Sequence, residues 1–158
     1  KIISLDDAKG ENGTLIMFIC NHCPYVIATI EDIVHTAKEL EKEGIKSIAI
    51  MSNDPTDYPE DSFENMIKFH EKYDFGFPYV YDEDQSVGIK YDAVCTPDFF
   101  GFNNKNELQY RGRLEASQQQ LIPNSPKELL EAMLLVAKTG NGPKDQIPSI
   151  GCSIKWKV

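Results

Sequence analysis

Residues 15–24 read LIMFICNHCP, the most informative stretch of the sequence. Its first five residues form a continuous apolar run, which is typical of a strand buried on both faces of a sheet. Cys20 and Cys23 follow that run, and Pro24 stands where the first turn of a helix would begin, a position that tolerates proline. The stretch therefore predicts a buried strand, a helix after it and a CxxC motif at the junction between them.

Strand-like and helix-like patterns alternate along the rest of the chain. Apolar side chains between Val26 and Leu40 recur three and four residues apart, which predicts a helix that Gly44 terminates. Ser125 and Glu128 have the spacing of a capping box at the start of the last helix. The other expected strands are 45–51, 78–81, 94–102 and 108–111, and the other expected helices are 62–73, 84–91 and 125–138.

The order of these elements predicts an α/β architecture. A parallel start followed by an antiparallel hairpin finish fits it, because strands joined by a helix lie parallel and strands joined by a short turn lie antiparallel. Neither an internal repeat nor a linker interrupts the pattern. We therefore expect residues 1–158 to form a single domain, with 144–158 as a C-terminal tail.

Composition narrows the range of partners. The chain has 158 residues, 41% of them hydrophobic and 26% charged, and a formal net charge of −9. An acidic chain argues against nonspecific binding to nucleic acid or to an anionic membrane surface. No apolar run approaches the ~18 residues that a membrane-spanning helix needs, and no signal-peptide pattern is visible from Lys1 onward. We expect a cytoplasmic protein with neither nucleic acid nor membrane as a partner.

A CxxC at a strand–helix junction favours thiol chemistry. Unpaired backbone N–H groups and the positive end of the helix dipole stabilise a thiolate there, and cysteine pKa values in such motifs fall to roughly 3.5–7.5 from about 8.5. The spacing predicts that Cys20 attacks a disulfide or an oxidant and that Cys23 resolves the adduct. Asn21, His22 and Pro24 are then the neighbours expected to tune the pair. His22 as a cation would stabilise a thiolate, or it would only shape an exposed loop.

Two further interpretations of these cysteines stay open. A CxxC also forms half of a zinc site, but a second pair of ligands is then needed. Cys95, Cys152, His35 and His70 each lie singly in the sequence. The other alternative is a pair of buried, inert cysteines. We therefore expect no metal ion and no bound cofactor.

The segment Cys95-Thr96-Pro97 is the second informative site. Proline at the start of a strand is compatible with a cis X–Pro bond or with an ordinary trans edge strand. The residues alone do not choose between the two.

Three motifs together carry a resemblance to a known family: residues 18–26 (FICNHCPYV), 95–100 (CTPDFF) and 148–157 (PSIGCSIKWK). They are similar to the bacterial peroxiredoxin-like redoxins of the thioredoxin superfamily, and the resemblance runs nearly end to end. It implies a thioredoxin fold, in which a central mixed β-sheet is flanked by helices on both faces. It also implies that Thr96-Pro97 forms a cis-proline loop that faces the CxxC and helps to hold the bound substrate chain.

The chain departs from both thioredoxin and the peroxiredoxins. Ile19 stands where thioredoxin has Trp, and the two inner residues of the motif are Asn-His rather than Gly-Pro. Cys23-Pro24 looks like the Cys-Pro of peroxiredoxins, whose cysteine reduces peroxides. A peroxiredoxin, however, has Thr or Ser at the position that Cys20 occupies here. Neither Arg111 nor Arg113 can be assigned from the sequence as the arginine that partners a peroxidatic thiolate.

These observations predict a thiol–disulfide oxidoreductase. Its partners would be protein or small-molecule disulfides and a dithiol reductant such as a thioredoxin or glutathione system. The alternatives are a thiol peroxidase that uses Cys23, a metal-binding or metal-delivery module of the copper type, and a non-catalytic interaction domain. Cys95, beside the Thr-Pro loop, and Cys152, in a tail that can fold back over the site, are candidates for additional redox thiols.

Overall fold

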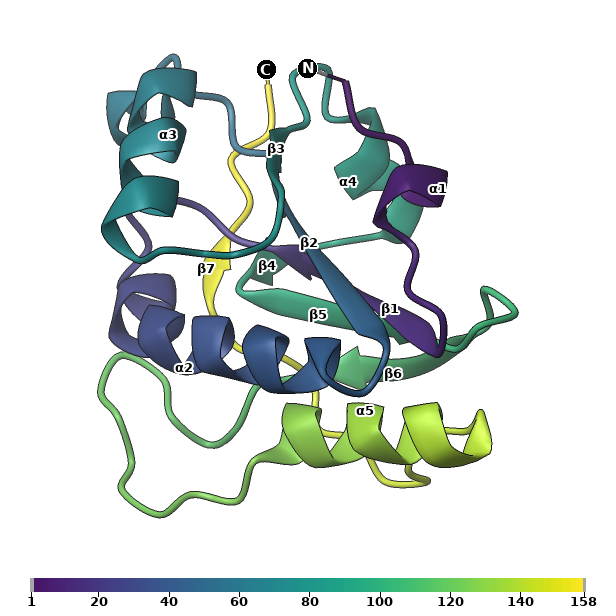
Figure 1. Cartoon of the computed structure of the whole chain (residues 1–158). Helices are drawn as coiled ribbons and strands as arrows, with labels where there is room; N and C mark the ends of the chain where they lie inside the picture. The colour runs from purple at the N-terminus through teal and green to yellow at the C-terminus, as the bar shows by residue number, and fades with distance from the viewer. Residues whose placement is uncertain (1, 158) are drawn as a thin grey trace.

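The computed structural model describes residues 2–157, and a five-stranded sheet forms its centre (Figure 1). The strand order is β3-β2-β1-β5-β6. The strands are β1 (Gly13–Phe18), β2 (Ile45–Met51), β3 (Tyr79–Tyr81), β5 (Asp98–Phe102) and β6 (Leu108–Gly112). Strands β1, β2 and β3 are parallel, whereas β5 and β6 run antiparallel to their neighbours. The predicted parallel start and antiparallel finish are confirmed.

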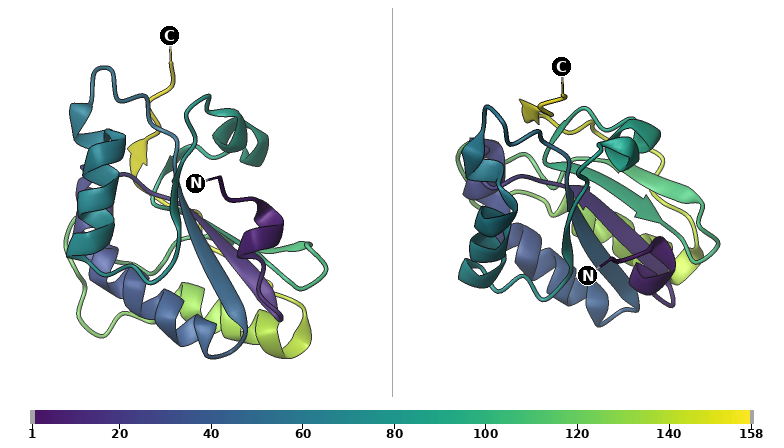
Figure 2. Two further views of the ribbon diagram at one scale, coloured as in Figure 1. Left: turned by 45° about the horizontal axis from the view of Figure 1, so that its top comes forward. Right: turned by 90° about the horizontal axis from the view of Figure 1, so that it is seen from above.

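Helices cover both faces of this sheet (Figure 2). Leu15 and Met17 of β1 pack into the core formed with α2 (Pro24–Glu41), α3 (Phe63–Lys72) and α5 (Glu128–Thr139). Ile16 and Phe18 face the other way, into a second cluster with residues of α1 (Leu5–Ala8) and α4 (Ser86–Tyr91). Because successive side chains of a strand point to opposite faces, a centre strand covered on both sides has to be apolar throughout.

The last helix starts later than the capping box predicts, and that prediction is wrong. The Ser125 hydroxyl accepts a hydrogen bond from the backbone N–H of Ala116 (3.3 Å), and α5 begins only at Glu128. The Glu128 carboxylate forms two hydrogen bonds with the guanidinium of Arg113 (3.0 and 2.9 Å). Both expected capping groups are therefore engaged in tertiary contacts.

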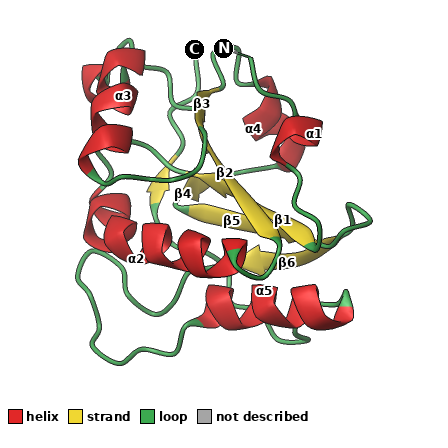
Figure 3. Ribbon diagram, in the orientation of Figure 1, coloured by secondary structure: helices red, strands yellow, loops and turns green. Residues whose placement is uncertain are grey.

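The expected strand 94–102 is two strands with a cis Thr96–Pro97 peptide bond between them (Figure 3). The first piece, β4 (Cys95–Thr96), leaves the main sheet and pairs antiparallel with β7 (Cys152–Ser153). The C-terminal tail therefore contains a short strand, and in Figure 1 it runs alongside β4. A 3-10 turn, η1 (Pro59–Asp61), precedes α3.

Candidate active site

The two cysteines of the CxxC lie between β1 and α2, with Cys23 as the N-cap residue of α2 and Pro24 as its first residue. The backbone N–H groups of Val26 and Ile27 donate to the Cys23 carbonyl (3.0 and 2.9 Å), and this closes the first turn. Proline fits there because its missing N–H would have no partner inside the helix. All four cysteines of the chain are free thiols, and Cys20 and Cys23 are both completely buried.

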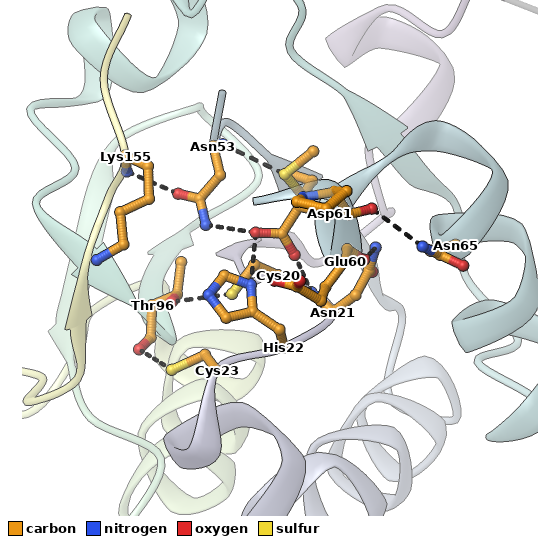
Figure 4. Close-up of polar contacts among 12 residues, drawn as sticks. Cys20, Asn21, His22, Cys23, Asn53, Glu60, Asp61, Asn65, Thr96 and Lys155 are labelled. Atoms are coloured by element: carbon orange, nitrogen blue, oxygen red, sulfur yellow. Dashed lines mark hydrogen bonds and ion pairs between the residues drawn. The ribbon is translucent and has the colours of Figure 1, made fainter. Parts of the chain in front are cut away.

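Thr96 links the two cysteines to the loop that the sequence singled out. Its hydroxyl lies 3.5 Å from the Cys20 sulfur, and its carbonyl accepts a hydrogen bond from the Cys23 thiol at 3.4 Å. Figure 4 shows both sulfurs turned toward Thr96. The peptide bond to Pro97 is cis, which resolves the choice that the sequence left open. The expected approach of the Thr-Pro loop to the CxxC is therefore present in the fold.

The two thiols have opposite electrostatic environments. A hydrogen bond from the Cys20 thiol, helped by others from Cys152, Thr96 and the backbone of Val26, lowers the pKa of Cys23 although burial opposes the shift. The hydrogen bond to Cys23, burial and the nearby Asp61 carboxylate raise the pKa of Cys20. These shifts favour Cys23 as the more acidic thiol of the pair.

Asp61 is a member of the site that the sequence analysis missed. This carboxylate is 0% exposed and accepts two hydrogen bonds, from the Asn21 backbone N–H (2.8 Å) and from the Asn53 amide (2.9 Å), and His22 Nδ1 lies 2.7 Å from one of its oxygens. The His22 ring also stacks on Tyr58 with 5.4 Å between ring centroids. Figure 4 shows Asp61 above the motif, aimed at His22. His22 is thus held by a buried carboxylate and is not a free loop residue.

Asn21 fixes the outer part of the same loop. Its side-chain N–H donates to the Glu60 carbonyl (3.0 Å), and its side-chain oxygen accepts from the Tyr79 hydroxyl (2.9 Å). The 3-10 turn η1 and the strand β3 are therefore tied to the CxxC loop. These contacts give Asn21 a positioning role, because both polar atoms of its side chain are hydrogen-bonded, one to η1 and the other to β3.

Cys20, His22 and Asp61 are also the residues that could hold a metal ion. Each offers one ligand atom, and the three atoms all lie within 4.8 Å of one another. Thiolate, imidazole and carboxylate are all ligands for zinc, which takes four in structural sites. Cys23, which shifts the pKa of Cys20, is a further thiol beside this cluster.

The remaining two cysteines differ in what they contact. The Cys95 thiol is buried and points to the Pro97 carbonyl (3.7 Å), and burial raises its pKa to about 12. The Cys152 thiol, which is only partly buried, lies within hydrogen-bonding reach of Cys23. The tail does fold back over the site, as the sequence suggested, and it brings one of the two additional thiols to the CxxC.

The two arginines are engaged at other places. Arg113 pairs with Glu128, and Arg111 lies over the Phe100 ring (4.8 Å to its centroid) and contacts the Asp92 carboxylate (3.9 Å). Neither forms a hydrogen bond with Cys23 among the contacts of residues 2–157. A guanidinium that stabilises a peroxidatic thiolate is therefore not part of this arrangement.

The charge state of Cys23 sets the pH dependence of its reactivity. Its lowered pKa means that the thiolate persists as pH falls from 8 to 6, whereas an ordinary thiol of pKa about 8.5 loses thiolate on the order of 100-fold over that range. We expect a thiolate absorbance near 240 nm at pH 6 in the reduced protein and in Cys95→Ser, and its loss in Cys23→Ser. An absorbance that develops only above pH 8 would contradict the assignment.

Comparisons with known proteins come from sequence and from structure. An uncharacterized conserved protein from Geobacillus kaustophilus is 44% identical with a TM-score of 0.93, over 99% of this chain and 84% of its own. A hypothetical protein from Sinorhizobium meliloti is 33% identical with a TM-score of 0.92, over 99% of this chain and 86% of its own. No curated protein matches the sequence.

More distant matches bear on the fold alone. A secreted disulfide oxidoreductase of Mycobacterium tuberculosis is 16% identical with a TM-score of 0.55, over 68% of this chain and 75% of its own. Thioredoxin-like proteins also match, so the expected thioredoxin fold is confirmed. In the part of the chain that the structure describes, no helix is long and apolar enough to cross a membrane.

The sequence also matches a family model, that of the AhpC/TSA family, over residues 1–113. This match covers well over half of the chain, and it contains the CxxC, Asp61 and the cis-proline loop. A redox function of its thiols accords with that family and with the geometry of the site. The chain belongs to the AhpC/TSA family.

Proposed function

We propose that this protein is a thiol–disulfide oxidoreductase whose redox couple is Cys20–Cys23. One observation carries the proposal: Cys23 is the buried N-cap residue of α2, and the neighbouring Cys20 lowers its pKa. The more acidic thiol and its resolving partner are therefore neighbours before any substrate arrives. The proposal reverses the order of attack expected from sequence, because the helix begins at Pro24 and so caps with the second cysteine.

The chemistry follows in two exchanges. The Cys23 thiolate attacks one sulfur of a substrate disulfide, forms a mixed disulfide and releases the other sulfur as a thiolate. Cys20 then loses its proton and attacks the Cys23 sulfur, which expels the second substrate thiolate and leaves a Cys20–Cys23 disulfide. A dithiol reductant of the thioredoxin or glutathione type restores both thiols. The substrates are protein or small-molecule disulfides.

His22 and Asp61 have a role in the second exchange. The hydrogen bond to Cys23, burial and the Asp61 carboxylate raise the pKa of Cys20, so Cys20 holds its proton until the adduct on Cys23 has formed. One Asp61 oxygen and one His22 nitrogen lie within 4.8 Å of the Cys20 sulfur and are the candidates to accept that proton. The pair thus delays resolution and then assists it.

The proposal is tested by thiol trapping across a glutathione redox series, followed by peptide mapping. We expect a reversible disulfide between Cys20 and Cys23, whose midpoint gives the reduction potential of the couple. Cys95 should remain a thiol through the series, because its sulfur points to the Pro97 carbonyl. Cysteines that never pair would remove the proposal.

A thiol peroxidase is the second candidate, favoured by Cys23-Pro24, by the lowered pKa of Cys23 and by the family match. The Cys23 thiolate would attack the peroxide O–O bond, become a sulfenic acid and release an alcohol or water. Cys20 would then condense with it to a disulfide and release water. Consumption of one equivalent of hydrogen peroxide by Cys20→Ser, and none by Cys23→Ser, is expected if this activity exists. Its absence from the intact protein would eliminate it.

A metal-binding module is the candidate from another class, favoured by the cluster of Cys20, His22 and Asp61. A bound ion would protect Cys20 from alkylation, and the protection would end when a chelator is added. Stoichiometric zinc or copper in the purified protein would support it. Full redox activity of protein free of metal would decide for the oxidoreductase.

A further inference from the structure

The tail strand β7 places a third thiol at the redox pair. Its residue Cys152 lies opposite Thr96 in the antiparallel β4–β7 ladder. Thr96 is the residue whose carbonyl accepts a hydrogen bond from Cys23 (3.4 Å), and Cys152 packs against the core cluster that contains Cys23, within hydrogen-bonding reach of it. Cys23 therefore lies between two thiols, one from its own motif and one from the tail.

Main-chain contacts fix the tail in this position. Gly151 approaches Thr96 so closely that a Cβ there would collide with the Thr96 carbonyl, so only glycine fits. Beyond β7, the Ile154 N–H donates to the Val94 carbonyl (3.1 Å), and the Ile154 side chain is 4% exposed in the second core cluster. The Lys155 N–H donates to the Asn53 side chain (2.9 Å), as Figure 4 shows. Cys152 is thus held beside Cys23 from both sides along the chain.

We propose that Cys152 is a second exchange partner of Cys23, so that the oxidised protein interconverts between a Cys20–Cys23 and a Cys23–Cys152 disulfide. The proposal rests on the oxidoreductase function above. In the step, the Cys152 thiolate attacks the Cys23 sulfur, the Cys23–Cys152 bond forms and the Cys20–Cys23 bond breaks. The electron pair leaves on Cys20, which takes up the proton that Cys152 lost. No external oxidant or reductant is consumed.

The exchange solves a problem of access. Cys20 and Cys23 are both 0% exposed, whereas Cys152 is only partly buried. A reductant therefore reaches a Cys20–Cys23 disulfide less readily than a Cys23–Cys152 disulfide, which presents one sulfur near the surface. Disulfide exchange depends on such access as well as on thiolate character. Exchange with Cys152 therefore moves the disulfide to a partly exposed sulfur, and the core does not have to open.

Charge on the neighbouring groups favours the step in the oxidised protein. Burial and the hydrogen bond to Cys23, followed by the negative charge of Cys23, raise the pKa of Cys152, while Lys155 opposes the shift. Once Cys23 is in a disulfide, its charge is gone and the effect of Lys155 remains. Cys152 therefore ionises more readily when there is a disulfide for it to attack.

The experiment oxidises the Cys20→Ser variant with glutathione disulfide and maps the products by mass spectrometry. Glutathione first forms a mixed disulfide with Cys23, and Cys152 then displaces it as glutathione thiol. We expect most of the protein to contain a Cys23–Cys152 disulfide, because a thiol held in place competes with millimolar external thiol. Cys20→Ser/Cys95→Ser is the matched control, and it should give the same product.

Three results would overturn the proposal. Cys23 that stays glutathionylated while Cys152 remains a thiol would overturn it, as would pairing of Cys23 with Cys95. In the wild-type background, Cys152→Ser should slow reduction of the oxidised protein by glutathione severalfold at an unchanged melting temperature, and an unchanged rate would also overturn it. Peptide mapping of the oxidised wild-type protein separates the two proposals, because the absence of a Cys20–Cys23 disulfide there refutes the oxidoreductase function itself.

Discussion

We expect Cys23→Ser to lower the rate of dithiol-dependent disulfide reduction by roughly 10³-fold or more, the scale on which an enzyme loses activity without its activated nucleophile. The hydroxyl of serine keeps the size of the side chain and the N-cap of α2, but at neutral pH it supplies no anion for attack. Reduction of an insulin-type protein disulfide by dithiothreitol measures the effect. The melting temperature of the variant should stay close to that of the wild type.

The matched variant is Cys20→Ser/Cys152→Ser, which lacks both thiols that contact Cys23. Its first exchange should proceed at a rate close to that of the wild type, and the reaction should then stop at a mixed disulfide between Cys23 and the substrate. Mass spectrometry after one turnover detects this adduct. The opposite pattern, with an adduct on Cys20 in Cys23→Ser, would restore the order of attack that the sequence alone suggests.

The second large effect is expected at Asp61. Asp61→Ala leaves the Asn21 backbone N–H and the Asn53 amide without their acceptor in a buried site, and it removes the carboxylate that His22 Nδ1 contacts at 2.7 Å. A buried donor left without a partner costs about 1–3 kcal/mol. With two such donors, we expect the free energy of unfolding in urea to fall by about 2–6 kcal/mol.

Two variants distinguish the contributions of charge and hydrogen bonding at this position. Asp61→Asn keeps one acceptor, so its loss of stability should be smaller than that of Asp61→Ala. It also removes the negative charge beside Cys20 and should lower the pKa of Cys20. His22→Ala removes only one contact of the carboxylate, and His22 is partly exposed, so its effect on stability should be the smallest. An Asp61→Ala variant as stable as the wild type would refute the argument.

The spacing of apolar residues along the sequence predicted most of the architecture. The run from Leu15 and the repeat between Val26 and Leu40 are set by the two faces of one sheet, so the pattern in the sequence mirrors the packing. Local signals failed where tertiary contacts compete with them. Ser125 and Glu128 satisfy the capping spacing, yet one binds the backbone of Ala116 and the other binds an arginine.

The candidate site was predictable in its cysteines but not in its carboxylate. The CxxC and Thr96-Pro97 stand out because their residue types and spacing are unusual. Asp61 lies in a short 3-10 turn without periodicity, in a polar segment that resembles any surface loop. One signal was present: this segment follows β2, which lies parallel and adjacent to β1, so both strands end at the same edge of the sheet as the CxxC.

The N-cap position of Cys23 couples the redox state of the protein to the stability of a helix. The first turn of α2 stabilises a thiolate at Cys23, and by reciprocity the thiolate stabilises α2 by the same free energy. In the proposed couple, oxidation would remove the negative charge, and the backbone of Val26 would then face a neutral sulfur. Reduction therefore stabilises α2, the longest helix among residues 2–157, as binding of an anion at its N-terminus would. Oxidation destabilises it as release of that anion would.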